Sequence, residues 1–593
     1  MELLAGCRIS SCAFNRAEQS GMSLSLAALG LNSQHPAPNP RLRVLRLLAL
    51  TCLSSLLLMA DDFIQQLFTS ANQAELELRF VVVVWLFSLS LWLVAMPGLV
   101  TALLVVLCTM QLIQLSHISF FGEPLTGPDI VSLFNDFAEV RETGWHSFAD
   151  HWHVLPSVLL PYALLIFLHR WVPSQIDLPR SRWALLIIVL VLGAKPYRAT
   201  YRDLSSFMPG PTRSGLHNSF NAFAFYAVRL AFRPVDALPQ APFQPYQVQR
   251  QPSTAQHVWL VVADSLRTDR LGVLGYPRNT TPNLSRMASA NQLLAKPGIA
   301  AGVSTAVSLP NLLNLIREPG QTELLSTQPH NLFSLARQEG FRTHWLSAQE
   351  SKLLSHLGSR HLDVSITRED HPLLFLKRHD HALIDILKEQ QWAMRNFVVL
   401  NLRTAHLPYE ENYAKHSEPL PLWPADSELP REQRQANAYD NAVGYLDDVL
   451  AEIIEQFDQL EGERYLIITG DHGQLLGEDG RWGHNDLLPQ VVEVPVLVVA
   501  RDAPAQHLQV LKEEDWISHY EAGVWLAQRL GWQISNPNQT RGEHFVQGKQ
   551  LFGDNMIKRV VETPEGLQYD APRLLSRWLK DLGPTGRARA AGE

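Results

Sequence analysis

The pattern of hydrophobic positions divides the chain into two parts. Before residue 200 it contains long apolar runs with few charges: Val44–Ala60, Phe80–Met96, Leu99–Leu115, Val154–Leu168 and Trp183–Ala194. Such runs predict five membrane-spanning helices. Because two runs are shorter than the ~20 residues that a span prefers, we expect these helices to extend into flanking residues. The alternative is a soluble domain of buried helices, which would have to bury all of these runs.

The distribution of Lys and Arg predicts the orientation of the spans. Basic residues precede the first span and lie between the fourth and the fifth, whereas the loops 61–79 and 116–152 contain only Arg79 and Arg141. The positive-inside rule then places the N-terminus in the cytoplasm and the chain after residue 198 on the other side. In a bacterium, this predicts a multi-pass protein of the inner membrane with its C-terminal domain in the periplasm.

Changes in composition along the chain suggest domain boundaries. The first segment reads as a disordered cytoplasmic lead-in without a secretory signal, in which either Met1 or Met22 is the start. The predicted units are the lead-in at 1–40, the transmembrane domain at 41–197, an interfacial helix and linker at 198–253, a second large domain at 254–580, and a disordered tail at 581–593.

Two further segments have the apolar spacing of amphipathic helices. Residues 127–140, GPDIVSLFNDFAEV, predict a helix at the outer membrane interface, and residues 217–232, HNSFNAFAFYAVRLAF, predict a helix along the membrane surface. Asn135 and Glu139 lie four residues apart on one face of the first helix. That face is either solvated or in contact with a substrate, and the spacing leaves both interpretations open.

Composition narrows the classes of function. The chain of 593 residues has a formal net charge of -8 and no basic block, which argues against nucleic-acid binding. All four cysteines lie at or before Cys108. Any metal site in the C-terminal part must therefore use oxygen and nitrogen ligands.

From residue 257 onward, short apolar runs alternate with helical segments. The runs are HVWLVVAD, FRTHWLS, FVVLNLRTAH, YLIITGDHG and VPVLVVA, and the segments between them include NLFSLARQEG and YDNAVGYLDDVLAEIIEQF. This alternation predicts an α/β fold around a mainly parallel central sheet. In such folds, ligands collect at the carboxyl ends of the strands.

Candidate functional side chains follow three of the predicted strands. They are Asp264 after the first, His406 after the third, and Asp471 with His472 after the fourth. Asp264 alone could be a helix N-cap, but the adjacent Asp–His pair suits Zn²⁺ with oxygen and nitrogen donors. His484, in the Gly-rich stretch GEDGRWGHN, is expected in a loop at the same edge.

The stretch AGVSTAVSLP, residues 301–310, contains a candidate nucleophile, Thr305. By itself the stretch reads as an ordinary turn. A metal held by Asp264, Asp471 and His472, however, would keep its fourth coordination position open. A hydroxyl placed there would become a nucleophile near neutral pH, and Thr305 is the candidate for that position.

Three motifs resemble those of the phosphoethanolamine transferases of the alkaline phosphatase superfamily. They are VADSLRTDRLGVLGYPRNTTPNL, AGVSTAVSLP and TGDHGQLLGEDGRWGHN, and the similarity extends from residue 43 to residue 530. The resemblance implies a membrane domain of five helices followed by a zinc-dependent, sulfatase-like periplasmic domain. It implies one Zn²⁺ and leaves a second one open.

The resemblance also implies roles for individual residues. The implied metal ligands are Asp264, Thr305, Asp471 and His472. Thr305 would be the nucleophile, while His406 and His484 would contact the transferred phosphate or assist proton transfer. Lys352, in WLSAQESK, would help to read the head group, and Asn135 and Glu139 are further candidates for substrate contact. The stretch YDNAVGYLDD would form a scaffold helix.

The chain departs from the family pattern around the nucleophile. The family commonly has Glu where this chain has Asp264, and the cysteines that flank the nucleophile are replaced by Ala301 and Asn311. The usual first Thr of the motif is Val303. The loop that contains the nucleophile must therefore hold its shape by packing rather than by a disulfide.

The activity implied by the resemblance is the transfer of phosphoethanolamine. The donor would be phosphatidylethanolamine, the acceptor lipid A, the lipopolysaccharide core or another envelope glycan, and the intermediate a phosphorylated Thr305. The alternatives are a phosphoglycerol transferase that uses phosphatidylglycerol and a catalytically inactive, lipid-binding sensor. A formylglycine sulfatase is disfavoured, because no C/S-x-P/A-x-R motif lies near Thr305.

Overall fold

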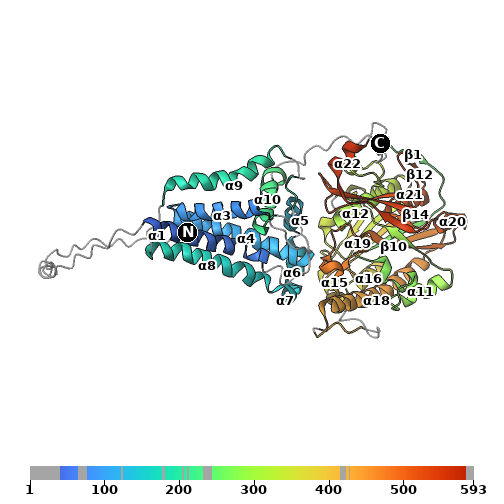
Figure 1. Ribbon diagram of the computed structural model, residues 1–593. Coiled ribbons are helices and arrows are strands. Elements are labelled where there is room, and N and C mark those ends of the chain that lie inside the picture. The colour runs from blue at the N-terminus through green and yellow to red at the C-terminus, as the bar shows by residue number, and fades with distance from the viewer. Residues whose placement is uncertain are drawn as a thin grey trace, which may run out of the picture.

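The chain forms a bundle of helices followed by an α/β domain (Figure 1). This computed structural model describes residues 40–63, 77–121, 124–135, 137–175, 180–202, 206–209, 213–231, 243–354, 356–413, 423–426 and 428–582. The bundle comprises the described residues up to 231, and the α/β domain begins at residue 243.

Each of the predicted apolar runs forms a helix, and each of these helices reaches beyond the run on at least one side. They are α1 (Pro40–Leu58), α3 (Leu78–Leu93), α4 (Pro97–Phe121), α8 (Val154–Gln175) and α9 (Leu185–Ala199). α1, α4 and α9 run toward the α/β domain, whereas α3 and α8 run back (Figure 1). The helices pack through apolar side chains such as Leu104, Leu107 and Leu165, which are buried between them.

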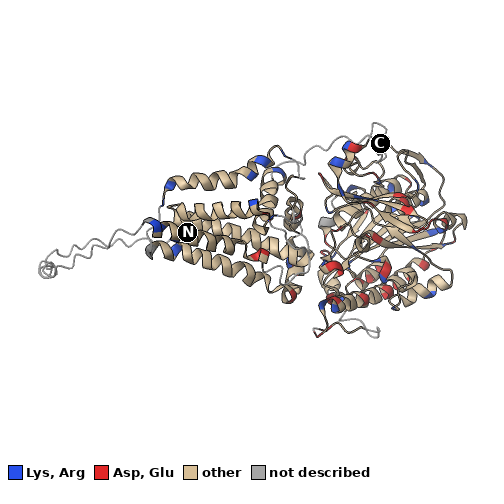
Figure 2. Cartoon of the chain, viewed as in Figure 1, with Lys and Arg blue, Asp and Glu red and all other residues tan. Residues whose placement is uncertain are grey.

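Length and composition single out two of the described helices as able to cross a membrane. They are Pro97–Phe121 and the part of α8 at Val154–Pro173, while Leu78–Leu93 is apolar but shorter. Charged residues lie toward the ends of the long helices, and the middle stretches are free of them (Figure 2). Five spans therefore stay a prediction, supported most directly by α4 and α8.

The predicted single helix over residues 127–140 is instead two helices, α5 (Gly127–Asn135) and α6 (Phe137–His146). Ile130 of α5 is buried against α10 (Gly215–Phe225), while Glu142 of α6 pairs with Arg403 of the α/β domain. Different partners therefore hold the two ends of the segment. α10 itself packs against α4, α5 and α9, so that most of its side chains are buried in the bundle rather than spread along a surface.

The α/β domain is built on a mixed, mostly parallel sheet, as predicted. Among the described residues this sheet has eight strands in the order β11-β3-β10-β7-β2-β6-β4-β5. Their bounds are β11 Ile517–Ser518, β3 Leu294–Ile299, β10 Glu493–Arg501, β7 Arg464–Gly470, β2 His257–Ala263, β6 Asn396–Leu402, β4 Arg342–Ser347 and β5 Val364–Ile366. The predicted strand VPVLVVA is β10, and it runs antiparallel to both of its neighbours, β7 and β3.

Helices cover both faces of this sheet, because alternate side chains of the central strands are apolar on both faces. In β2, Trp259 and Val261 face one layer, whereas Val258 and Leu260 face the other. The first layer contains α11 (Pro282–Ser289), α16 (His381–Glu389) and α18 (Arg431–Asp458). The second layer contains α12 (Thr305–Leu313), α14 (Leu332–Gln338) and α21 (His519–Leu530) (Figure 1).

Smaller sheets and short helices complete the α/β domain. Strand β1 (Gln247–Arg250) pairs with β12 (Trp532–Ser535), and β8 (Leu475–Leu476) pairs with β9 (Trp482–Gly483). A further sheet contains β13 (Glu543–Gln547), β14 (Met556–Thr563), β15 (Gly566–Tyr569) and β16 (Arg573–Leu574). The remaining helices are α7 (Phe148–His151) in the bundle and α13 (Glu323–Thr327), α15 (Pro372–Arg378), α17 (Tyr409–Tyr413), α19 (Pro489–Val492), α20 (Gln506–Glu513) and α22 (Leu575–Asp581) in the α/β domain.

Polar contacts join the helical bundle to the α/β domain. Arg434 donates to both carboxylate oxygens of Asp150, at 2.7 and 2.9 Å, and Arg431 donates to Nε2 of His151 at 2.7 Å. Further pairs are Arg403 with Glu142, Glu411 with His146, and Lys549 with Asp129. On the bundle side, these polar contacts come from α5, α6 and α7, in the segment after α4.

Replacing Asp447 with Ala is expected to destabilise the α/β domain. The buried Asp447 carboxylate of α18 accepts the backbone N–H groups of Asn283 at 2.7 Å and Leu284 at 3.0 Å, at the start of α11. Without it, these N–H groups lose their partner, at a cost of about 1–3 kcal/mol. We expect a lower midpoint of thermal unfolding. Asp448→Ala is the control, because this half-buried neighbour accepts only from the Asn283 side chain in the described contacts. Equal midpoints for the two variants would contradict the assignment.

Candidate metal centre and nucleophile

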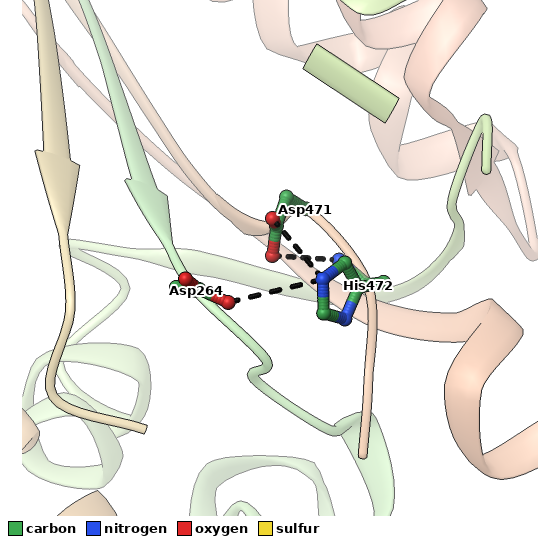
Figure 3. Close-up of side chains that lie close together, drawn as sticks. All are labelled: Asp264, Asp471 and His472. Carbon is green, nitrogen blue, oxygen red and sulfur yellow. Dashed lines mark hydrogen bonds and ion pairs between the residues drawn. The ribbon is translucent and has the colours of Figure 1, made fainter. Parts of the chain in front are cut away.

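The register of two central strands brings the predicted metal ligands together. β2 and β7 are parallel neighbours in which Ala263 lies opposite Gly470, so the next residues, Asp264 and Asp471, leave the sheet side by side. With His472, they offer ligand atoms that all lie within 4.8 Å of one another (Figure 3). The cluster lies at the carboxyl edge of the parallel strands, where the sequence predicted it.

The tautomer of His472 turns a lone pair toward the two carboxylates. Nδ1 of His472 lies 2.8 Å from the carbonyl oxygen of Gly473, to which it donates its hydrogen. Nε2 then has a free lone pair, and it lies 3.4 Å from Asp471 Oδ2 and 3.8 Å from Asp264 Oδ1. Three acceptor atoms that face one another are the arrangement expected around a cation.

Neighbouring side chains hold the carboxylates in place. Ser265, in the left-handed region at φ 61°, donates from its backbone N–H to Asp471 Oδ1 at 3.0 Å and from Oγ to Asp264 Oδ1 at 2.9 Å. Gln349 donates to Asp264 Oδ2 at 2.9 Å. Tyr439 of α18 donates to the carbonyl of Ser265 at 2.7 Å, which confirms the predicted scaffold role of that helix.

The sequence analysis did not identify the roles of Ser265 and Gln349. Ser265 directly follows Asp264, and Gln349 lies two residues beyond the end of β4. Position after a strand was therefore the available signal, since both lie at the same edge as the candidate ligands. Their polar side chains by themselves are equally common in turns.

Electrostatics favour a cation at this cluster. Asp264 is 3 % exposed, and Asp471 and His472 are fully buried. Burial raises the pKa of Asp471, and the neighbouring Asp264 carboxylate raises it further, while His472 and Thr305 act in the opposite direction. Oδ2 of Asp471 has no hydrogen-bond partner among the described residues. Two buried carboxylates, an imidazole lone pair and an unpaired oxygen fit a divalent metal with oxygen and nitrogen ligands.

The structure places Thr305 beside this cluster. Thr305 is the first residue of α12, after Ser304, and its side chain is half-buried. Its Oγ1 lies 3.4 Å from Nε2 of His472. The hydroxyl thus lies next to the same lone pair that faces the two carboxylates. The start of α12 also presents the positive end of the helix dipole, which favours a phosphate group at this point.

His406 and His484 extend the site away from the cluster. The ring centroid of His484 lies 4.4 Å from that of His472 and 6.0 Å from that of His406. His406 follows β6, and Nδ1 of His484 lies 3.3 Å from the carbonyl oxygen of Val303 in the nucleophile loop. All six predicted metal-binding and catalytic residues of the α/β domain therefore meet in one place.

The predicted substrate contacts cannot be placed in the same way. The side chains of Asn135, Glu139 and Lys352 lie outside the described part of the structure. Their roles stay predictions.

The helical bundle reaches the edge of the site. The rings of Phe120 and Phe121, at the end of α4, lie so close to Gly483 that an added Cβ would be 3.0 and 3.1 Å from them. Gly483 directly precedes His484. On the other side, Glu142 of α6 lies 3.3 Å from the guanidinium of Arg403, three residues before His406. Both loops that contain the outer histidines are therefore in contact with the bundle.

Comparison with known proteins adds to the description of the α/β domain. Residues 256–520, within this domain, match the Sulfatase family model. Over both parts, the chain resembles the integral membrane protein lipooligosaccharide phosphoethanolamine transferase A (EptA) from Neisseria meningitidis. That match has a TM-score of 0.55 at 20% identity and covers 82% of this chain and 95% of the other. It shows that the helical bundle and the α/β domain share the fold of that protein.

Curated relatives confirm the resemblance to phosphoethanolamine transferases. The chain is 24% identical over 322 residues to the putative transferase YhbX of Escherichia coli K12, covering 52% of this chain and 56% of the relative. It is 26% identical over 360 residues to the Kdo(2)-lipid A phosphoethanolamine 7''-transferase of the same organism, covering 56% and 61%. The chain thus spans less than two thirds of the length of these relatives.

Replacing His472 with Ala is expected to remove most of the bound metal. The change deletes one of three clustered ligands and leaves two buried carboxylates without the imidazole. Metal content of the purified chain, measured after dialysis against a zinc-containing buffer and then a zinc-free one, checks this. His507→Ala is the matched control, because His507 pairs with Tyr465 away from the cluster. Metal retention by His472→Ala equal to that of the control would rule out the assigned site.

Proposed function

We propose that this chain is a zinc-dependent phosphoethanolamine transferase of the bacterial inner membrane. It would move phosphoethanolamine from phosphatidylethanolamine to lipid A, the lipopolysaccharide core or another envelope glycan. The observation that carries the proposal is the position of the Thr305 hydroxyl, 3.4 Å from His472 Nε2 and beside two buried carboxylates. Relatives named phosphoethanolamine transferases support it, as does the match of residues 256–520 to the Sulfatase family model.

Asp264, Asp471 and His472 would hold the zinc ion, with Thr305 as the fourth ligand. When bound, zinc supplies positive charge that acidifies a coordinated hydroxyl and offsets negative charge that develops on phosphoryl oxygens. Ser265 and Gln349 orient the two carboxylates, as their hydrogen bonds to Asp264 and Asp471 indicate. Because all three ligands are buried, they would hold the ion away from bulk water.

In the first half-reaction, Thr305 Oγ1 attacks the phosphorus of the donor lipid. A bond forms between Oγ1 and phosphorus, and the bond from phosphorus to the glycerol oxygen breaks. One of the two imidazoles, of His406 or His484, accepts the proton of the Thr305 hydroxyl, and the other delivers a proton to the leaving oxygen. Diacylglycerol leaves, and phosphoethanolamine stays on Thr305.

In the second half-reaction, a hydroxyl or phosphate oxygen of the acceptor attacks the same phosphorus. The bond to Thr305 Oγ1 breaks, and Thr305 regains its proton as the acceptor loses one. His484 is suited to this exchange, because its ring lies between those of His472 and His406. The first turn of α12 presents backbone N–H groups and dipole charge to the phosphoryl oxygens throughout.

Exposed aromatic side chains support access from the membrane. In the part of the bundle that contacts the α/β domain, Trp145 is 80 % exposed, Trp152 60 %, and Phe134 and Phe137 each 59 %. Large aromatic residues at one level are typical of the interface between lipid and water. We place this level at the outer leaflet, next to the edge of the site, so that a donor lipid enters sideways while its diacyl chains stay in the membrane.

Thr305→Ala is expected to abolish transfer while the chain still binds zinc. The substitution removes the attacking oxygen, whereas Asp264, Asp471 and His472 still offer three ligands. The measurement is the formation of a covalent adduct by intact mass, together with zinc content. Thr305→Ser, which retains a hydroxyl at the same Cβ, is the matched control and should form the adduct more slowly. Adduct formation by Thr305→Ala would disprove the nucleophile assignment.

The mass of the adduct identifies the donor. The purified full-length protein is incubated separately with phosphatidylethanolamine and phosphatidylglycerol, and the modified peptide is sequenced. We expect a phosphoethanolamine adduct on Thr305 from the first lipid alone. A phosphoglycerol adduct would retain the mechanism and overturn the donor. If the protein binds zinc but forms neither adduct, a lipid-binding sensor becomes the better description.

A further inference from the structure

His519 is a fully buried histidine that lies behind the site. It is the first residue of α21 and follows the short edge strand β11. A capping box fixes the start of this helix, since the Ser518 hydroxyl accepts the N–H of Glu521 and the Glu521 carboxylate accepts the N–H of Ser518. The capping box therefore fixes the backbone of His519 independently of the contacts that its ring makes.

The ring of His519 bonds to two separate segments through its two nitrogens. Nδ1 accepts the backbone N–H of Ala301 at 3.2 Å and lies 3.1 Å from Oγ of Ser308. Nε2 lies 2.9 Å from the carbonyl oxygen of Gly470, to which it donates its hydrogen. Since an amide N–H can only donate, Nδ1 must be unprotonated and Nε2 must carry the proton. The neutral form agrees with burial, which lowers the pKa of His519 to about 4.

The two segments are the chain around the nucleophile Thr305 and the end of β7, which directly precedes the metal ligands Asp471 and His472. Ala301 precedes Thr305 by four residues, and Ser308 follows it by three, so the ring contacts the chain on both sides of the nucleophile. Gly470 directly precedes Asp471. Gly470 is also held from the Asp264 side, because an added Cβ would lie 2.6 Å from the carbonyl oxygen of Leu266.

We propose that His519 is a positioning residue that ties the nucleophile loop to the end of β7 and thereby sets the distance between Thr305 and His472. The proposal rests on the function proposed above, and it assigns to one neutral imidazole the bracing that a disulfide would otherwise provide. The positions that flank the loop, Ala301 and Asn311, are not cysteines.

Other bonds hold the loop in directions that do not involve β7. Val303 N–H donates to the carbonyl of Gln547 at 3.1 Å, and Gln547 N–H donates to the carbonyl of Ala301 at 3.0 Å. Ala300 N–H donates to the carbonyl of Val492 at 2.9 Å. These contacts fasten the loop to β13 and to the end of α19, and the His519 ring adds the connection toward Asp471 and His472. Without it, the loop could shift along β7 while the other bonds stay intact.

A small shift of this kind would slow the chemical step. A misplacement of about 1 Å at a reacting atom can cost about 100-fold in rate. We therefore expect His519→Phe to form the Thr305 adduct about 10- to 100-fold more slowly, with an unchanged KM for the donor lipid and unchanged zinc content. A ring of similar size fills the space but offers neither nitrogen.

Two conservative variants separate the contribution of the hydrogen bond at Nδ1 from that of the hydrogen bond at Nε2. His519→Asn places an amide oxygen near the position of Nδ1 and can accept from Ala301, whereas His519→Gln places an amide nitrogen near the position of Nε2 and can donate to Gly470. Each is expected to form the adduct faster than His519→Phe and more slowly than the native chain. His344→Phe is the matched control, because His344 is equally buried, in β4 of the same sheet, and packs on Trp392.

Hydrogen exchange at the loop tests the connection between the nucleophile loop and β7 without relying on activity. The Ala301 amide should exchange about fivefold faster or more in His519→Phe than in the native chain or in His344→Phe, as loss of about 1 kcal/mol of protection implies. Native exchange and native adduct rate in His519→Phe would overturn the proposal, as would equal losses in both Phe variants. If the native chain itself forms no adduct, the proposed function fails, and the exchange at Ala301 alone decides the role of His519.

Discussion

Two buried carboxylates held side by side are the constraint on which the rest of the site depends. Parallel pairing of β2 with β7 places Asp264 next to Asp471, and burial prevents water from relieving the repulsion between them. A cation removes that cost, and His472 completes a set of ligands for it. The same cluster organises its neighbours. Ser265 and Gln349 donate to the two carboxylates, and Thr305 lies next to His472.

The helical bundle takes part in the site as well as anchoring it. The ends of α4 and α6 contact the loops that precede His484 and His406, through Phe120, Phe121 and Glu142. The three clustered ligands come from the ends of β2 and β7 instead. The sheet therefore positions the metal ligands. The contacts with the bundle help to position the histidines that would bind the substrate and transfer its protons.

The departures from the family pattern have local compensations. Asp264 reaches less far than Glu would, and hydrogen bonds to both of its oxygens hold it in a single orientation. The nucleophile loop lacks flanking cysteines, and its backbone is held by hydrogen bonds with Gln547 and by N–H groups that donate to Val492 and His519. Hydrogen bonds thus compensate for the shorter side chain at Asp264 in the first case and for the missing disulfide in the second.

Periodicity and motif spacing determined a large part of this description. The alternation of runs predicted the α/β fold. The position of Asp264, Asp471 and His472 after strands predicted that they lie at one edge of the sheet, because parallel strands end at the same edge whatever their order. Sequence did not show that β10 is antiparallel, that residues 127–140 form two helices, or that His519 joins the loop to β7. Only tertiary structure decided these, because each depends on contacts between segments far apart in the chain, such as Ala301 with His519, which no local pattern encodes.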